Sequence, residues 1–216
     1  MKLPRDGRAL IAAVTLGLLA ACGSSSSASV EPTPSADSAV ATVNSRPDGP
    51  AVPCTDLTTP VSTVAPTAVP TGAGDRLAAL SLACLGGGAD VNLADLRGPA
   101  LLNVWASWCG TCAQEVAYLV EAHRALGGTV RFLGLDVADD AADARAWNDF
   151  HHVYWPSLAD PTSEIRGPLR VPGPPVTFFI RSDGTLAGVH YGAFTSTDEV
   201  RAAVEKQLGP IAKGTG

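Results

Sequence analysis

Two cysteines separated by two residues constrain this chain more than any other feature of its sequence. Cys109 and Cys112 directly follow residues 101–108, an apolar segment with the length of a buried β-strand. A helical pattern then begins at once, with one face formed by Val116, Leu119, Val120, His123 and Leu126. We therefore predict a strand that delivers Cys109 to the N-terminus of a helix.

The position of Cys109 at the start of a helix predicts a reactive thiolate. At a helix N-terminus, the unpaired amide groups and the positive end of the helix dipole stabilise a thiolate over a thiol. Two intervening residues let one helical turn bring the sulfurs close enough to form a disulfide. Zinc sites use the same spacing, but they need further ligands, typically a second spaced pair. The sequence has no second spaced pair, and the only two histidines close to each other, His151 and His152, are adjacent. We favour redox chemistry and expect no metal.

The N-terminus predicts export. The formal net charge of the 216-residue chain is −6 and no basic patch stands out, which argues against a nucleic-acid partner. Residues 1–21 have a positively charged start and an apolar segment too short to cross a membrane comfortably. Their end, Leu19-Ala20-Ala21-Cys22, resembles the bacterial lipobox, so we predict a lipoprotein signal peptide and lipidation of Cys22. Ordinary secretion or a retained anchor is the alternative. Lipid chains would hold the protein on the outer face of the cytoplasmic membrane.

Export bears on the other cysteines, because disulfides persist outside the cytoplasm. With Cys22 lipidated and Cys109 paired with Cys112, only Cys54 and Cys84 remain. The even number favours a structural disulfide between them, and two free thiols are the alternative. Residues 22–75 are rich in Ser, Thr, Ala and Pro without a hydrophobic period, so we predict a disordered tether. A bridge to Cys84 would pin part of that tether to the domain.

Residues 76–213 predict one α/β domain. Asp139 and Asp140 precede a predicted helix, as acidic residues at a helix start often do, and a metal-ligand role is the alternative. Ser196 and Glu199 form a capping box at the start of the last helix. The other expected elements are short apolar segments at 77–85 and 91–93, a strand at 130–137, a helix at 141–151, and a hairpin of 178–181 with 186–191.

The Trp-Cys-Gly-Thr-Cys sequence at 108–112 resembles the active site of the thioredoxin superfamily. The phrase at 91–98 ahead of it looks like the extracytoplasmic TlpA/ResA/DsbE-like branch. This resemblance implies an α/β thioredoxin fold, with a central mixed β-sheet flanked by helices, an N-terminal β-hairpin and an inserted helix. It also implies that Gly110 and Thr111 tune the reduction potential. Trp108 is expected to shield the pair, with a core aromatic as the simpler interpretation.

The same resemblance points to three further residues. A cis-proline that faces the cysteines is expected before a central strand, and Pro175 occupies that position, although Pro174 precedes it. Thioredoxin has a buried aspartate where this chain has Asn103, which cannot titrate. Glu115, one helical turn after Cys112, is the candidate to handle the proton instead. A solvated charge on the helix surface is the alternative for Glu115.

The resemblance implies a thiol–disulfide oxidoreductase of the cell envelope, in which Cys109 exchanges with a partner and Cys112 resolves the mixed disulfide. We lean toward a reductase, with a disulfide-forming oxidase as the alternative. A Sco-like copper chaperone would have three residues between its cysteines, and a non-enzymatic lipoprotein would need neither sulfur. We expect no cofactor beyond the Cys109–Cys112 disulfide. The expected partners are protein thiols or disulfides and an unidentified, membrane-bound electron donor or acceptor.

Overall fold

The computed structural model describes residues 52–61 and 75–210, which belong to the second of two compact units of the chain. The predicted signal peptide over 1–21, the lipidation site Cys22 and most of the predicted tether lie outside them. The strands are β1 (Ser81–Cys84), β2 (Val91–Asn92), β3 (Ala100–Trp105), β4 (Arg131–Val137), β5 (Ser157–Asp160), β6 (Val176–Ile180) and β7 (Leu186–Tyr191). The helices are α1 (Gly110–Leu126), α2 (Ala141–Phe150), α3 (Thr197–Leu208) and the short 3-10 helices η1 (Leu93–Asp95) and η2 (Glu164–Arg166).

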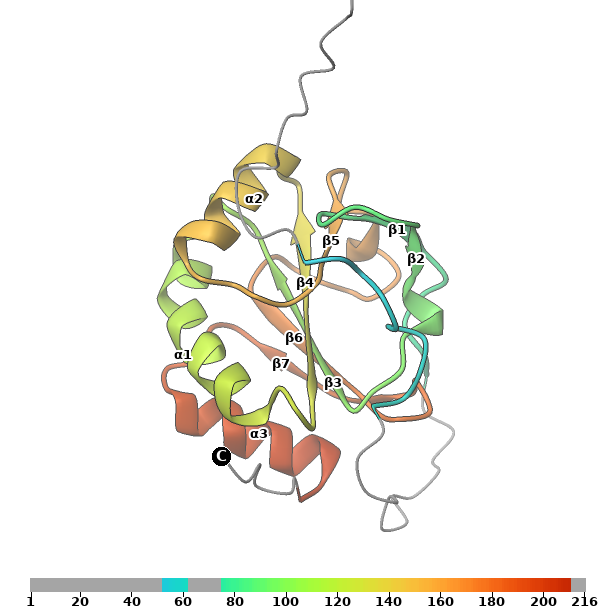
Figure 1. Cartoon of the computed structure of the whole chain (residues 1–216), viewed down its shortest axis with the longest axis vertical. Helices are drawn as coiled ribbons and strands as arrows, with labels where there is room; N and C mark the ends of the chain where they lie inside the picture. Colours follow the sequence, from blue (N-terminus) through green and yellow to red (C-terminus); the bar gives the residue numbers. More distant parts are fainter. Residues whose placement is uncertain (1–51, 62–74, 211–216) are drawn as a thin grey trace, which may run out of the picture. The chain divides into compact units, whose positions relative to one another are not determined.

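The strands form one mixed sheet in the order β2-β1-β5-β4-β3-β6-β7 (Figure 1). Strands β3, β4 and β5 are parallel, and helices α1 and α2 form the crossovers between them. Strand β6 runs antiparallel to β3, and β1 runs antiparallel to both β2 and β5. The expected N-terminal hairpin and inserted helix are therefore both present. No helix among the described residues is long and apolar enough to span a membrane.

The two faces of this sheet are covered differently. Side chains alternate along a strand, so in β3 Leu102 and Val104 pack on one face, whereas Leu101 packs on the other with α1 and α3. All three α-helices contribute to the second face, and the buried residues of η1 and η2 contribute to the first. Figure 1 shows α1 and α3 side by side along the sheet, in keeping with their contact.

Residues 52–61 complete the face without α-helices, and the predicted tether over 22–75 is wrong for this segment. Leu57 is 3% exposed and packs in the core beneath the sheet. Its carbonyl oxygen accepts a hydrogen bond from the backbone N–H of Arg97 at 3.0 Å, and a disulfide joins Cys54 to Cys84. One buried leucine, a covalent bond and backbone hydrogen bonds thus anchor a segment whose composition alone indicated disorder.

The central strand β3 fixes where the cysteines lie. All six of its residues are buried, because β4 and β6 flank it and both faces are covered. Its carboxyl end leads through a turn at 106–108 directly into α1. The parallel neighbour β4 ends at the same edge, so its following loop meets this turn. Figure 1 shows this edge, where α1 and α2 begin.

Candidate active site

The cysteine pair occupies the first turn of α1. Cys109 is the N-cap residue, and its sulfur accepts a hydrogen bond from the backbone N–H of Cys112 at 3.2 Å. A disulfide joins the two cysteines, so the structure represents the oxidised form. Cys109 is 5% exposed and Cys112 is 1% exposed. The strand–turn–helix arrangement predicted from the spacing therefore places the sulfur of Cys109 among the unpaired amides of a helix start.

Three exposed residues surround the pair. Gly110 and Thr111 lie on the surface of the first helical turn, and the hydroxyl of Thr111 lies 3.5 Å from the sulfur of Cys109. The side chain of Trp108 is 59% exposed, and its indole N–H donates to the carbonyl oxygen of Ala138 at 2.9 Å. The simpler interpretation of Trp108 as a core aromatic is therefore wrong. The turn aims it away from the sheet, and the loop after β4 holds it beside the cysteines.

The Pro174–Pro175 peptide bond is cis, at the position expected from the resemblance. Strand β6 begins at the next residue, and Val176 lies opposite Val104 of β3. Because β3 and β6 are antiparallel, this register places Pro175 beside the end of β3 that leads to the cysteines. The carbonyl oxygen of Pro175 accepts a hydrogen bond from the backbone N–H of Gly192 at 3.1 Å.

Glu115 is fully buried, so its interpretation as a solvated charge on the helix surface is wrong. The amide of Asn103 donates to one carboxyl oxygen at 2.9 Å, and the backbone N–H of Phe194 donates to the other at 2.9 Å. The same Asn103 amide donates to the hydroxyl of Thr177 at 3.2 Å. Burial raises the pKa of Glu115 to about 7, against the opposing effect of the two hydrogen bonds. Glu115 therefore titrates near neutral pH, one helical turn from Cys112.

Two acidic residues lie at the same edge: Asp136, which the sequence interpretation missed, and Asp139, which it placed only at the start of a helix. The carboxylate of Asp139 accepts hydrogen bonds from both the backbone N–H and the hydroxyl of Ser107, the latter at 2.9 Å. Asp136, in β4, is 1% exposed, and burial, followed by the nearby Asp139, raises its pKa to about 8. The sequence signal that could have revealed Asp136 is its place as a charged residue inside the apolar strand predicted at 130–137. Asp140 caps α2 as expected, accepting from the N–H of Ala142 at 2.7 Å.

The remaining surroundings of the pair are apolar. Leu85, Trp105, Ala106 and Ala144 pack in one cluster with the two cysteines. Trp105 in turn stacks on Trp147 of α2, with ring centroids 4.4 Å apart. Among the residues that the structure describes, no group of three or more Cys, His, Asp or Glu side chains could hold a metal ion. The disulfide is shielded from water by apolar side chains on one side and accessible to a partner on the other. This arrangement is suited to thiol–disulfide exchange.

A mixed sheet with a disulfide at the start of its first long helix, and a cis-proline beside it, defines the class of thioredoxin-like proteins. The Redoxin family model matches residues 72–208, and the chain belongs to that family. Its relatives are thiol:disulfide interchange proteins, and it is a thiol–disulfide oxidoreductase of the same family.

The similarity to these relatives covers the domain of this chain but only part of the length of each relative. The thiol:disulfide interchange protein DsbE of Pseudomonas fluorescens biotype C is 36% identical over 129 residues, which cover 59% of this chain and 69% of the relative. DsbE of Vibrio cholerae serotype O1 is 38% identical over 99 residues, 45% of this chain and 52% of the relative. The chain thus spans about half to two thirds of these relatives.

Among solved structures, a secreted Mycobacterium tuberculosis disulfide oxidoreductase homologous to E. coli DsbE is similar, with a TM-score of 0.51 and 26% identity. The match covers 58% of this chain and 94% of that one.

Proposed function

We propose that this protein exchanges disulfides with protein thiols outside the cytoplasm, that Cys109 and Cys112 carry the reaction, and that it works mainly as a reductase. The observation that carries the proposal is the disulfide at the first turn of α1, where a backbone N–H already donates to the sulfur of Cys109. The same amide would stabilise the thiolate of the reduced form, which is the nucleophile in disulfide exchange.

The reaction takes two exchange steps. The thiolate of Cys109 attacks a partner disulfide, forming a mixed disulfide and releasing one partner sulfur as a thiolate. The thiolate of Cys112 then attacks Cys109, which restores the Cys109–Cys112 disulfide and releases the second partner sulfur. Two electrons pass to the partner, and the two released partner thiolates take up protons from solvent, which already holds the proton of Cys109 and receives that of Cys112 by way of Glu115. A dithiol electron donor in the membrane must reduce the pair again, and no cofactor other than the disulfide is needed.

Glu115 accepts the proton that Cys112 loses in the second step. Its carboxyl lies one turn along the same helix, is buried, and has a pKa of about 7, so it can change protonation state at neutral pH. Asn103 takes the place of a titrating residue beneath the pair and holds Glu115 through its amide. Proton handling thus shifts from the strand, where thioredoxin has its aspartate, to the helix.

The exposed residues around the pair meet the partner. Pro175 has no N–H group and its carbonyl oxygen already bonds to Gly192, so its ring is the part of this segment that can contact a partner beside Cys109. Trp108 offers an apolar side chain beside Cys109, while Gly110 and Thr111 adjust the stability of the thiolate and so the potential. The Cys54–Cys84 disulfide has a structural role, because it fastens residues 52–61 to β1.

An extracytoplasmic location is supported by the two disulfides, since such bonds persist in oxidising compartments. The similar M. tuberculosis protein is described as secreted. The lipid anchor at Cys22 rests on Leu19-Ala20-Ala21-Cys22 in the sequence. We place the protein on the outer face of the cytoplasmic membrane, where a tether that begins at Cys22 would let it reach protein thiols or disulfides of the envelope.

The deciding experiment is the reduction potential of the Cys109–Cys112 pair in the mature chain carrying Cys22→Ser, equilibrated against glutathione or dithiothreitol. A value below about −220 mV supports the reductase, and a value near −150 mV identifies an oxidase of exported thiols, the second candidate for this site. Cys112→Ala is expected to trap a mixed disulfide on Cys109, and Cys109→Ser to abolish exchange. Exchange that survives in Cys109→Ser contradicts the proposal.

A further inference from the structure

The turn that presents Cys109 is held from outside its own strand. The backbone N–H and hydroxyl of Ser107 both donate to the carboxylate of Asp139, and the indole of Trp108 donates to Ala138 in the same loop after β4. Within the turn, the N–H of Cys109 donates to Ala106 at 3.1 Å. The two residues immediately before the cysteine are therefore held by this loop, Ser107 by the Asp139 side chain and Trp108 by the Ala138 carbonyl.

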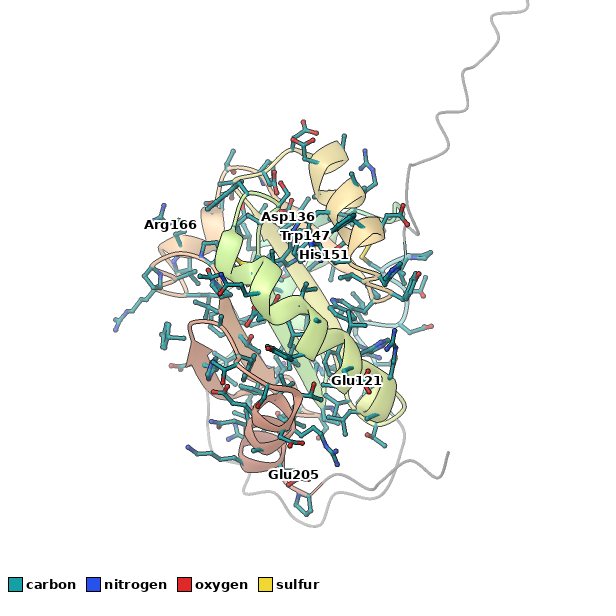
Figure 2. All side chains as sticks on the ribbon, turned by 90° about the vertical axis from the view of Figure 1, so that its left-hand side faces the viewer. Glu121, Asp136, Trp147, His151, Arg166 and Glu205 are labelled. Carbon is teal, nitrogen blue, oxygen red and sulfur yellow. A yellow bond between two sulfur atoms is a disulfide. The ribbon has the colours of Figure 1, made fainter. Side chains whose placement is uncertain are left out.

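A second carboxyl group lies behind Asp139. Asp136 lies opposite Trp105 of β3 in the sheet register, is 1% exposed and hydrogen-bonds with Asp139. Its Oδ1 atom has no hydrogen-bond partner among the described residues. Figure 2 shows Asp136 near Trp147, the residue that stacks on Trp105, at the end of the domain where α1 begins.

These two carboxyl groups must share a proton. Two ionised carboxylates in contact repel each other strongly in a buried site. The other charged groups that act on Asp136 are Asp140, in the loop with Asp139, and Asp160 at the end of β5, and both are acidic. The oxygens of Asp139 already accept from Ser107 and from the N–H of Asp140, whereas Oδ1 of Asp136 accepts from no described residue. The proton therefore resides on Asp136, which donates it to Asp139.

We propose that Asp136 and Asp139 are positioning residues for Cys109, because the proton they share keeps Asp139 hydrogen-bonded to Ser107 in the turn before the cysteine. The inference rests on the proposed function, since it concerns the reactivity of Cys109. Loss of this proton places two negative charges in contact, drives Asp139 away from Ser107 and loosens the turn. The reactivity of Cys109 then falls, although rising pH favours its thiolate.

This mechanism predicts a decline at alkaline pH that ordinary thiol chemistry does not produce. A thiolate gains reactivity as pH rises through its pKa and then stays constant. Because the pKa of Asp136 is about 8, the rate constant of Cys109 is expected to fall above that pH. A loss of about tenfold between pH 7.5 and 9.5 corresponds to roughly 1.4 kcal/mol of lost stabilisation.

The test uses the reduced mature chain with Cys22→Ser and the small disulfide 5,5′-dithiobis(2-nitrobenzoate), followed from pH 5 to 10. Asp136→Asn keeps an N–H donor toward Asp139 but cannot ionise, so its plateau is expected to persist to pH 10. Asp149→Asn, at an exposed position of α2, makes the same change of charge away from the turn and is expected to follow wild type. A wild-type plateau that persists to pH 10, or a decline that Asp136→Asn shares, overturns the inference.

A second measurement needs no variant of Asp136. The ¹⁵N signal of the Trp108 indole, assigned by comparison with Trp108→Phe, is expected to titrate near pH 8 as its bond to Ala138 weakens. A signal that stays constant from pH 6 to 10 contradicts the inference even if Asp136→Asn does not fold. The small reagent and the indole signal test the turn directly and do not depend on a protein substrate. Failure of the wild-type protein to reduce protein disulfides would therefore refute the proposed function and not this inference.

Discussion

Replacing Glu115 by glutamine removes a proton-binding group from the interior of the domain, and the pH dependence of stability is expected to report the loss. Burial raises the pKa of this carboxyl from 4.5 to about 7 in the folded protein. Each unit of difference between folded and unfolded states corresponds to about 1.4 kcal/mol. Glu115 therefore changes the free energy of unfolding by roughly 3 kcal/mol between acid and neutral pH.

The sign follows from which state binds the proton more tightly. Between pH 4.5 and about 7, the folded protein holds the proton on Glu115, whereas the unfolded chain releases it. The contribution of Glu115 is thus most favourable below pH 4.5 and is lost as the pH rises through about 7. Glutamine lacks this dependence. The difference in unfolding free energy, variant minus wild type, is expected to rise by roughly 3 kcal/mol over that range.

Urea unfolding at a series of pH values from 4 to 8, followed by tryptophan fluorescence with both disulfides intact, measures this difference. The informative quantity is the slope of this difference against pH. A rearranged hydrogen bond to Asn103 or Phe194 would shift the unfolding free energy of the variant equally at every pH and leave that slope unchanged. Glu121→Gln is the matched control. Its side chain is exposed on the same helix and forms an ion pair with Arg124, and Figure 2 shows it toward the opposite end of α1 from Asp136. A variant-minus-wild-type difference that does not change with pH would refute our account of Glu115.

Three further predictions concern the scaffold. Leu57→Ala is expected to cost about 2–4 kcal/mol in urea unfolding, because Leu57 is buried at 3% exposure, and a loss below about 0.5 kcal/mol would mean that residues 52–61 do not pack. Replacing both Cys54 and Cys84 by serine is expected to cost about 3–4 kcal/mol and leave the Cys109–Cys112 potential unchanged, and a shifted potential would contradict a purely structural bridge. Gly98→Ala is expected to lower the free energy of unfolding by at least about 2 kcal/mol, because a Cβ there would lie 2.0 Å from the carbonyl oxygen of Ile180. A variant that unfolds at the same temperature as wild type would contradict that close approach.

The order of elements could be predicted from the sequence where pattern and chemistry agreed. The apolar segment before Cys109 became β3, and Ser196 caps α3 as expected, although the Glu199 side chain accepts from Thr195 rather than from Ser196. Each of these features is local, since a strand's burial or a helix's first turn is encoded within a few residues. Pro175 could be placed through the resemblance, because the strand that follows it is recognisable.

The parts that could not be predicted depend on distant contacts. Asp139 stands before a helix like an ordinary N-terminal acid, yet its carboxylate binds Ser107, thirty-two residues away. Glu115 fits a solvated helix position by spacing, and only the strand residue Asn103 and the backbone of Phe194 show that it is buried. Leu57 stands between polar neighbours, Asp56 and Thr58, and the segment has no hydrophobic period, so the sequence could not reveal its burial.

The described part of the chain contains two disulfides, and only the Cys109–Cys112 bond is suited to repeated cleavage. Cleavage of Cys109–Cys112 releases a sulfur at a helix start, where an amide stabilises the departing thiolate. Cys54 and Cys84 lie in an irregular segment and a strand, and neither has this support. Exchange is faster when the leaving thiol is more acidic. A dithiol donor can therefore reduce the Cys109–Cys112 disulfide repeatedly while the Cys54–Cys84 disulfide stays intact. The difference in leaving-group acidity thus protects the scaffold from the reductant that the active site requires.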